Sequence, residues 1–543
     1  MYITEVKSTK NGKSYKTVLI RESYRDESGK VKNKTLANLS KLPNEVILFI
    51  KSILKKEKSY VNLAELQREN NREYGASFAL MKLAQQIGLD RLISSTKSEW
   101  RDNVMVMIIG RILYQGSKLS LVNRYKDTML WELFGHKFNQ RPDVEKHCYF
   151  PMDELLKRKP RIERKLAKKH LSDGCIILYD ITNIWFEGKY KNSPIIVRGK
   201  GKGGKVGYKQ VAIGLLTDKR GCPVGVQLFK GNVSDQKTVL EQIKRVSSQY
   251  GIKHAIFTGD RGMLTAKIVK EISETDFKII TALTHSEMRK LIEKNNIPTN
   301  VFDEDKITEV IDSTANTRYM LCKNEKLKLK EGETRNSLIS KVSELLNKKA
   351  AVTRKRDPKD VAVSIGRIFE KYKIGKFFNF ELDERGGLTW ILKQDKIDSE
   401  KELDGAYIIK TTAASKLMNK KEIVIGYRNL QKVEQAFKNM KTILLELRPV
   451  YHKNDKRIEA HVFIVMLAYY LQWHAVQRLK PLLEPDKKGK NKRWTFELII
   501  ERLCSITSSD YYIKGVKVKT DISVPDQEQN TILELLKQIH CSQ

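Results

Sequence analysis

Alternating apolar and polar residues mark the first part of the chain, residues 1–40, where Asn-Gly and Ser-Gly pairs interrupt the alternation at 11–12 and 28–29. A period of two with such turns predicts a small β-hairpin or a three-stranded meander. From there to about residue 170, apolar residues recur three and four positions apart, which predicts helices. This part ends in a strongly basic stretch, 155–171, which is either a solvated helix face or a surface for DNA phosphates.

The period changes after residue 173, where short β-branched and aromatic runs are interleaved with helical ones. The pattern predicts strands at 175–188, 206–218, 223–232, 253–260 and 277–283, and helices at 235–251 and 264–274. Asp235 is the expected N-cap of the first of these helices, and Gly251 is its stop. Three strands, a helix, a strand, a helix and a strand is an order that a mixed sheet with packed helices accommodates.

The remainder of the chain mixes strand-like and helical stretches. Strand-like residues occupy 307–324, a basic helical stretch covers 333–359, and 376–394 has the pattern of a hairpin. A later helix is predicted at 426–447, and its buried stripe comprises Val433, Phe437, Met440 and Leu444. The apolar run at 460–473 is far shorter than the ~20 residues of a membrane span, so it predicts a buried core helix.

Composition indicates the class of partner that such a chain binds. The chain has 543 residues, of which 40% are hydrophobic, enough for about three to four domains with their own cores. Lys and Arg number 102 against 65 Asp and Glu, a net charge of +37. Such an excess points to a polyanion, nucleic acid first, although ribosome-associated and membrane-surface proteins share it.

Targeting signals and cysteine patterns restrict the compartment. The chain begins with charged residues and no apolar segment of a secretory signal, and its six cysteines are scattered without a C-x-x-C pair. We therefore expect reduced thiols, no zinc motif and a cytoplasmic protein.

Glycine and lysine are interleaved between residues 188 and 209, where no acidic residue occurs after Glu187. The stretch 199–205 is close to the P-loop pattern G-x-x-x-x-G-K-[ST], but Val206 replaces the hydroxyl residue. A P-loop also opens a helix, whereas the residues that follow have the pattern of a strand, so a P-loop ATPase is disfavoured. We expect instead a flexible basic loop that neutralises DNA phosphates. The lysines expected to do so are Lys200, Lys202 and Lys205.

Two aspartates fall on strands that a sheet of this order places side by side. Asp180 lies in the first strand, in "LYDITN", and Asp260 ends the fourth, in "FTGDRG". A single aspartate at a strand end is commonly a cap or a turn residue, but a pair on adjacent strands suits Mg²⁺, which prefers carboxylate oxygens.

A third carboxylate is available on the later helix. Tyr427, Glu434 and Lys441 are spaced seven apart, so they share one face if the helix begins near Tyr427. The alternative is that Glu434 and Lys441 belong to an ordinary solvated face.

These three blocks, "LYDITN", "FTGDRG" and "YRNLQKVEQAFKNMK", resemble the catalytic blocks of DDE transposases of bacterial insertion sequences, in the group with a Tyr-Arg-Glu-Lys motif. Tyr427, Glu434 and Lys441 match that motif, while Leu430 stands where the group has arginine, which puts the phosphate contact of that arginine in doubt. Arg428 is nearby, but we expect it on a different helix face. The resemblance covers about 173–475, and the N-terminal hairpin is also similar to one branch of these transposases.

The resemblance implies an α/β protein with an RNase H-like mixed-sheet core, interrupted by a mainly β insertion domain before the helix of the third carboxylate. We expect a small N-terminal β-hairpin unit, helical N- and C-terminal regions, and a basic DNA-binding character in the N-terminal helical region. The expected divisions are 1–45 (hairpin unit), 46–172 (helical, DNA-binding), 173–285 (core, first part), 286–403 (insertion), 404–480 (core, second part) and 481–543 (C-terminal helices).

The resemblance also implies an activity: binding of the element's ends, then metal-dependent strand cleavage and strand transfer by cut-and-paste transposition. Asp180, Asp260 and Glu434 would be catalytic and would hold two Mg²⁺ ions, for which Mn²⁺ is expected to substitute. Tyr427, Lys441 and Arg261 are the expected DNA contacts beside them.

The expected partners are double-stranded DNA, both transposon ends and target, and a second copy of the chain in the synaptic complex. The expected location is a bacterial cytoplasm, at the nucleoid, with no membrane. Two alternatives remain open: a DNA-binding protein derived from a transposase without catalysis, and an RNase H-like DNA nuclease that only hydrolyses.

Overall fold

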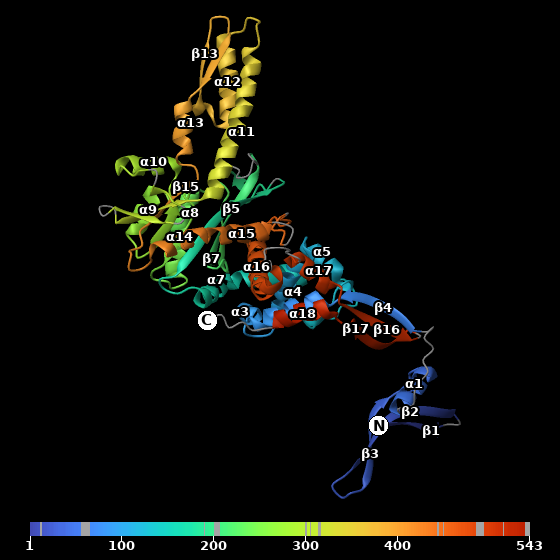
Figure 1. Ribbon diagram of the computed structural model, residues 1–543. Coiled ribbons are helices and arrows are strands. Elements are labelled where there is room, and N and C mark those ends of the chain that lie inside the picture. The colour runs from blue at the N-terminus through green and yellow to red at the C-terminus, as the bar shows by residue number, and fades with distance from the viewer. Residues whose placement is uncertain are drawn as a thin grey trace. The chain divides into compact units, whose positions relative to one another are not determined.

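The computed structural model describes residues 1–10, 13–55, 66–188, 190–199, 207–298, 301–303, 306–312, 316–441, 445–448, 450–484, 494–513 and 515–537. The chain forms two compact units, whose elements are labelled in Figure 1. One unit comprises Met1–Arg72 with Thr507–Ser523, and the other Glu73–Ile506 with Val524–Gln543.

The first unit contains the predicted meander. Three antiparallel strands, β1 (Tyr2–Lys10), β2 (Lys13–Arg25) and β3 (Val31–Asn38), lie in that order in one sheet. They are followed by α1 (Asn44–Leu54), whose Ile47 packs with Val18 and Leu39 in a small buried cluster. Side chains on a strand alternate between faces, so the sheet buries one face only.

A second sheet in this unit corrects the prediction of a purely helical C-terminal region. Its strands are β4 (Leu66–Glu73), β16 (Thr507–Ile513) and β17 (Val516–Ile522), in the order β17-β16-β4. The Thr-, Tyr- and Val-rich residues of 507–522 form a hairpin because they favour extended backbone. In the described part of this region, α17 (Phe496–Cys504), α18 (Gln527–Lys537) and the last residues of a preceding helix are helical.

The second unit opens with the predicted helices. They are α2 (Gly75–Gln86), α3 (Leu89–Ile93), α4 (Glu99–Tyr114), α5 (Lys118–Asn123), η2 (Arg124–Lys126), α6 (Leu130–Leu133), η3 (Glu145–Tyr149) and α7 (Phe150–His170). The basic stretch 155–171 lies in α7, and part of its charge is internal, because Lys159 is buried and pairs with Glu459 at 2.6 Å. The face of this helix is therefore not uniformly solvated.

A nine-stranded mixed sheet forms the centre of the second unit, with the order β11-β12-β15-β10-β9-β5-β7-β6 and β8 paired to β7. The strands are β5 (Ile176–Phe186), β6 (Val197–Arg198), β7 (Lys209–Asp218), β8 (Pro223–Lys230), β9 (Ile256–Thr258), β10 (Lys278–Ala282), β11 (Thr308–Asp312), β12 (Thr317–Lys323) and β15 (Ala406–Thr411). Strands β5 and β7 are antiparallel, whereas β5 and β9 are parallel. The predicted neighbourhood of the first and fourth core strands is confirmed.

Helices α8 (Asp235–Ser248), α9 (Ala266–Ser273) and α10 (His285–Lys294) connect these strands. The prediction that Asp235 is the N-cap of α8 is wrong. Asp235 is the first helical residue, and Ser234 occupies the cap position with extended backbone. The carboxylate still lies in the first turn, where the helix dipole favours a negative charge.

The insertion between β12 and β15 is mainly helical, so the prediction of a mainly β insertion domain is wrong. It consists of α11 (Glu325–Ala350), α12 (Pro358–Tyr372), η5 (Gly375–Phe377), the hairpin β13 (Phe378–Leu382) and β14 (Leu388–Leu392), and α13 (Gln394–Lys401). Helices α11 and α12 run side by side (Figure 1) and share one buried apolar cluster with the hairpin. The strands predicted at 307–324 belong instead to the central sheet, because β12 pairs with β15.

Three further helices of this unit are α14 (Lys420–Arg428), α15 (Leu430–Lys441) and α16 (Asp455–Leu483), and α17 and α18 also belong to it. The apolar run predicted as a core helix is the middle of α16, where every residue from Val462 to Trp473 is buried. Within the described residues, no helix combines the length and the apolar character that crossing a membrane requires.

Candidate active site

Strands β5 and β9 bring Asp180 and Asp260 to the same place. The parallel register pairs Leu178 with Thr258, and each aspartate comes two residues later in its chain. Each carboxylate accepts a hydrogen bond at 2.7 Å from the backbone N–H of the residue after it. The backbone thereby fixes one oxygen of each aspartate at this end of the paired strands.

Helix α15 presents Glu434 to this end of the sheet. The predicted buried stripe is present in the described part of the helix, where Val433, Phe437 and Met440 pack into the core, and the helix lies against β5. The pKa of the Glu434 carboxyl is raised, first by partial burial and then by the negative charge of Asp260. The two carboxylates therefore lie within electrostatic reach of each other.

Tyr427 reaches the same site from a different helix than predicted. Helix α14 ends at Arg428 and α15 begins at Leu430, so Tyr427 and Glu434 do not share one helix. Partial burial raises the pKa of Tyr427 to about 12, and the charge of Asp260 adds to the effect. The hydroxyl is consequently protonated, and able to donate a hydrogen bond, at any physiological pH.

Lys441 lies at the other end of α15, beside β5. Its Nζ donates to the hydroxyl of Thr182. Thr182 follows Asp180 by two residues, and side chains two apart on a strand share a face. The ammonium group is therefore on the face of the sheet to which the Asp180 side chain points.

One cavity of about 770 Å³ unites most of these groups, since Asp260, Arg261, Tyr427 and Glu434 all line it. These residues come from the loop after β9, the end of α14 and the middle of α15, so the tertiary fold is what brings them together.

Leu430 occupies the position of the family's arginine but is buried, whereas Arg428 faces the site. Leu430, at the position of the group's arginine, is 6% exposed and packs into the core. Arg428, expected on another helix face, lines the same cavity as Glu434 and donates a hydrogen bond to the Tyr407 hydroxyl at 3.0 Å. The break between α14 and α15 redirects it, and this cation is a residue that sequence reasoning missed.

Only part of the basic loop belongs to the described residues. Lys200, Lys202 and Lys205 lie outside the described residues. Of the loop's other cations, Arg198 lies in β6 and Lys209 opens β7, where its Nζ donates to the Tyr190 carbonyl at 3.1 Å.

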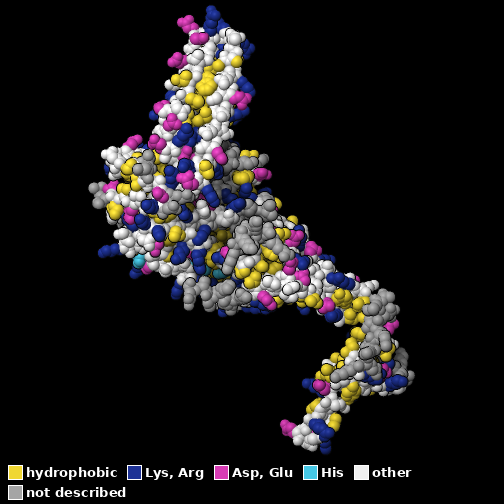
Figure 2. Space-filling model, viewed as in Figure 1, with side chains coloured by type: hydrophobic (Ala, Val, Ile, Leu, Met, Phe, Trp, Pro, Cys, Tyr) yellow, Lys and Arg dark blue, Asp and Glu magenta, His cyan; other side chains and the backbone are white. Residues whose placement is uncertain are grey.

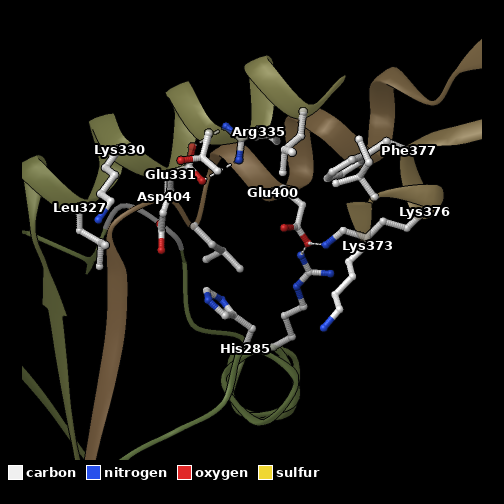
Figure 3. Close-up of a pocket in the computed structure, with 15 residues that line it drawn as sticks. His285, Leu327, Lys330, Glu331, Arg335, Lys373, Lys376, Phe377, Glu400 and Asp404 are labelled. Carbon is white, nitrogen blue, oxygen red and sulfur yellow. Dashed lines mark hydrogen bonds and ion pairs between the residues drawn. The ribbon is translucent and has the colours of Figure 1, made fainter. Parts of the chain in front are cut away.

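A second cleft, of about 360 Å³, adjoins the first, and both are lined by His285, Leu327 and Glu331. Figure 3 shows it between α10, α11 and α13. Five Lys or Arg residues line it against three carboxylates: Arg289, Lys330, Arg335, Lys373 and Lys376, with Glu331, Glu400 and Asp404. Positive charge thus continues from the site toward the insertion.

Comparison with known families identifies the family of the chain. The family model "Transposase DDE domain" matches residues 171–471, and the model "IS1634 family transposase, N-terminal domain" matches residues 3–72. The chain belongs to the IS1634-type DDE transposases of insertion sequences. Both matches confirm the resemblance seen in the three carboxylate blocks and the N-terminal hairpin.

Two solved structures are similar to the transposase, though distantly. The piggyBac transposase in a synaptic complex with hairpin DNA is 8% identical with a TM-score of 0.37, covering 81% of this chain and 82% of that one. The Mos1 transposase in a paired-end complex with a left transposon end is 11% identical with a TM-score of 0.15, covering 44% of this chain and 68% of that one. No curated protein matches the chain significantly in sequence.

DDE transposases use divalent metal ions, and the donor set of this transposase fits them. Hard divalent cations prefer carboxylate oxygens, and a cation would relieve the repulsion between Glu434 and Asp260. Asp180, Asp260 and Glu434 are not among the described residue sets whose ligand atoms all lie within 4.8 Å of one another. A pair of ions about 3.5–4 Å apart is held by ligands that lie farther from one another than the ligands of a single ion do, so such a pair does not require the three carboxylates to be so close.

Proposed function

We propose that this transposase binds the ends of its insertion sequence, cuts the DNA there and joins the cut ends to target DNA. The proposal depends chiefly on one observation within the DDE domain: Asp180 and Asp260 lie at the same end of the paired strands β5 and β9, and Glu434 on α15, a helix packed on β5, is within electrostatic reach of Asp260. Cleavage and strand transfer are the same displacement at phosphorus, with water or a 3'-hydroxyl as nucleophile, so one site serves both.

The three carboxylates would hold two Mg²⁺ ions, with Mn²⁺ as a substitute. When bound, the ions supply Lewis acidity to the attacking and leaving oxygens of the scissile phosphate. The chain contributes the placement: backbone amides fix one oxygen of each aspartate, and the packing of α15 holds Glu434 within electrostatic reach of Asp260.

Three further side chains would position the DNA. Tyr427 offers a protonated hydroxyl and a ring for stacking, and Lys441 offers a point charge for a phosphate. Arg261, exposed beside Asp260, lines the same cavity and would contact a neighbouring phosphate.

The remaining cations would guide the rest of the duplex. We assign the basic loop, with Lys200, Lys202 and Lys205, to one flank of the DNA path. The cleft of Figure 3 supports a path on the insertion side, since Lys330 and Lys373 line it without any ion pair among the described residues. Lys and Arg side chains also spread widely over the face shown in Figure 2.

Cutting two ends in one reaction requires two sites, so we propose that a homodimer forms around paired ends. We place this assembly at the nucleoid of a bacterial cytoplasm, where its DNA substrate lies.

The decisive experiment is cleavage of a labelled duplex that carries the DNA flanking this gene, in Mg²⁺ and in Mn²⁺. Wild type should nick at the element's ends, while Asp180→Ala, Asp260→Ala and Glu434→Ala bind the duplex and cut at least about 100-fold more slowly. Glu274→Ala is the matched control, because this exposed carboxylate follows α9 and lies outside the site.

The alternatives give different results. Binding without cutting by all variants, wild type included, would favour the non-catalytic DNA-binding protein. Cutting by wild type without joining to a target plasmid would favour the nuclease. Cutting that survives Glu434→Ala would show that another carboxylate completes the site.

A further inference from the structure

Three metal-ligating side chains from distant parts of the chain meet at one end of the central sheet, where β5 begins and β7 ends. His170 ends α7, Cys222 lies in the turn between β7 and β8, and His474 lies in α16. One ligand atom from each lies within 4.8 Å of the other two, and the Cys222 Sγ is 3.9 Å from the His170 Nε2. Among the described residues, no other set of three His, Cys, Asp or Glu is so close.

A second observation points to a missing partner at this place. The Nε2 of His474 is buried and has no hydrogen-bond partner among the described residues. A buried polar atom is nearly always satisfied, so an orphaned imidazole nitrogen beside a thiol and a second imidazole indicates a ligand that accepts electron pairs.

We propose that His170, Cys222 and His474 bind a zinc ion that is separate from the catalytic metals. Two imidazole nitrogens and a thiolate are ligands of borderline-soft cations such as Zn²⁺, whereas Mg²⁺ prefers oxygen. Zinc bonds of about 2.0–2.3 Å hold ligand atoms closer together than 4.8 Å, so binding would draw the three side chains inward. Water takes the fourth position.

Binding involves a proton and a hydrogen bond that can be accounted for. Burial raises the pKa of the Cys222 thiol, so zinc displaces the thiol proton to solvent as the sulfur–zinc bond forms. The His170 Nε2 gives up its contact with the Tyr470 hydroxyl, which is 3.1 Å away. Burial lowers the pKa of His170 to about 4 and of His474 to about 3, so both rings are neutral ligands at pH 7.

Charged side chains surround the proposed zinc site. Asp218 is 3% exposed and accepts hydrogen bonds from the Cys222 backbone at 2.9 Å and from the Arg220 Nε at 2.9 Å. Lys169 is the other nearby cation, with its Nζ 3.3 Å from the Tyr470 hydroxyl. Since Asp218 is paired with Arg220, the Cys222 thiolate is the ligand charge that would offset Zn²⁺.

The zinc would hold the turn on which the Glu434 helix rests. Gly221 precedes Cys222, and a Cβ added to it would lie 2.9 Å from the Cβ of Lys432, two residues before Glu434 in α15. The Lys432 Nζ also donates to the Lys219 carbonyl at 3.2 Å. The site therefore ties α7, the β7–β8 turn and α16 together at a contact with the catalytic helix.

The test is metal analysis of the full-length protein, purified without chelator, followed by replacement of zinc with Co²⁺. We expect about one zinc per chain and, with Co²⁺, a thiolate charge-transfer band in the near ultraviolet, which carboxylate-bound cobalt does not give. Cys222→Ser should abolish the band, and His474→Gln should weaken cobalt binding at least about tenfold. Cys175→Ser, a half-buried thiol outside the cluster, is the control and should retain the band.

Thermal unfolding separates metal loss from misfolding. A chelator should lower the Tm of wild type and leave that of folded Cys222→Ser unchanged. The proposal is overturned if folded wild type binds no zinc and shows no cobalt–thiolate band, or if the band persists in Cys222→Ser. These readouts do not depend on DNA cleavage, so the zinc site and the transposition chemistry can fail separately.

Discussion

Glu434 is the residue of the site whose charge its neighbours disfavour most clearly. Its pKa is raised by partial burial and by Asp260, so the folded protein binds the Glu434 proton more tightly than the unfolded chain does. Ionised Glu434 therefore costs stability at pH 7, and this cost disappears below the unfolded pKa of about 4.3. Metal-free Glu434→Gln should unfold about 1–2 °C higher than wild type at pH 7 and no higher at pH 4.

The effect is small because Glu434 is only partly buried, and solvent screens its interaction with Asp260. Calorimetry in chelator measures it, and Mg²⁺ should shrink the difference because the cation offsets the repulsion. Glu274→Gln, at a carboxylate outside the site, should leave the Tm unchanged at both pH values; a Tm of Glu434→Gln below that of wild type at pH 7 would contradict the argument.

Substitution of Lys441, at the C-terminal end of α15, tests the role of this lysine in cleavage. Because its ammonium group contacts Thr182, two residues from Asp180, Lys441→Ala should slow cleavage about 10- to 100-fold, the scale of one charge-assisted hydrogen bond. Single-turnover cleavage at saturating protein separates this loss from weaker DNA binding. Lys438→Ala, an exposed lysine on the same helix, should cut at the wild-type rate.

At the scale of elements, the position of α15 depends on how closely the β7–β8 turn approaches it. Gly221 has φ +86°, and an added Cβ would meet Lys432, so Gly221→Ala introduces both backbone strain and a collision with α15. Gly251→Ala is the matched control, because its φ of +76° imposes similar strain while nothing lies within 4 Å.

We expect Gly221→Ala to be about 1–3 kcal/mol less stable than Gly251→Ala and to cut more slowly, because α15 must shift. Urea unfolding and cleavage of the end duplex measure the two effects. Equal stability and equal cleavage in both variants would show that the turn does not position α15.

The elements of the core were predictable from sequence because each has its own period. Strands β5, β7, β8, β9 and β10 follow β-branched runs, and the parallel neighbourhood of β5 and β9 follows from their order. The break at Asn429 was not predictable, since apolar residues continue through it, and it moved Tyr427 to α14 and Arg428 into the cavity.

Long-range pairing explains the other differences. The insertion is mainly helical because the strands predicted at 307–324 pair within the central sheet instead, as β11 and β12. The cluster of His170, Cys222 and His474 has no sequence signature, since three elements far apart in the chain contribute one ligand each.

At the scale of the whole molecule, the net charge of +37 should make DNA binding strongly dependent on salt. If Lys200, Lys202 and Lys205 each neutralise a phosphate, replacing all three with alanine should reduce the slope of log K against log salt by about 2.7. Titration of a fluorescent end duplex at several salt concentrations gives the slope.

The corresponding triple arginine variant is the control, because it keeps the charge and should keep the slope. An unchanged slope in the alanine variant would remove the basic loop from the DNA path while leaving the catalytic assignment intact.

The position of β15 has a consequence for synthesis of the protein. This strand lies between β10 and β12 in the sheet, yet it follows the whole insertion in the chain, and α15 follows it in turn. At 5–20 residues per second, a ribosome takes roughly 10 to 35 s to proceed from Asp260 to Glu434. During that interval the nascent chain carries two aspartates and an unfilled gap in its sheet, so it has no complete site. If Glu434 completes the site as proposed, cleavage therefore requires translation through α15, and a chain that terminates before this helix would lack the third carboxylate.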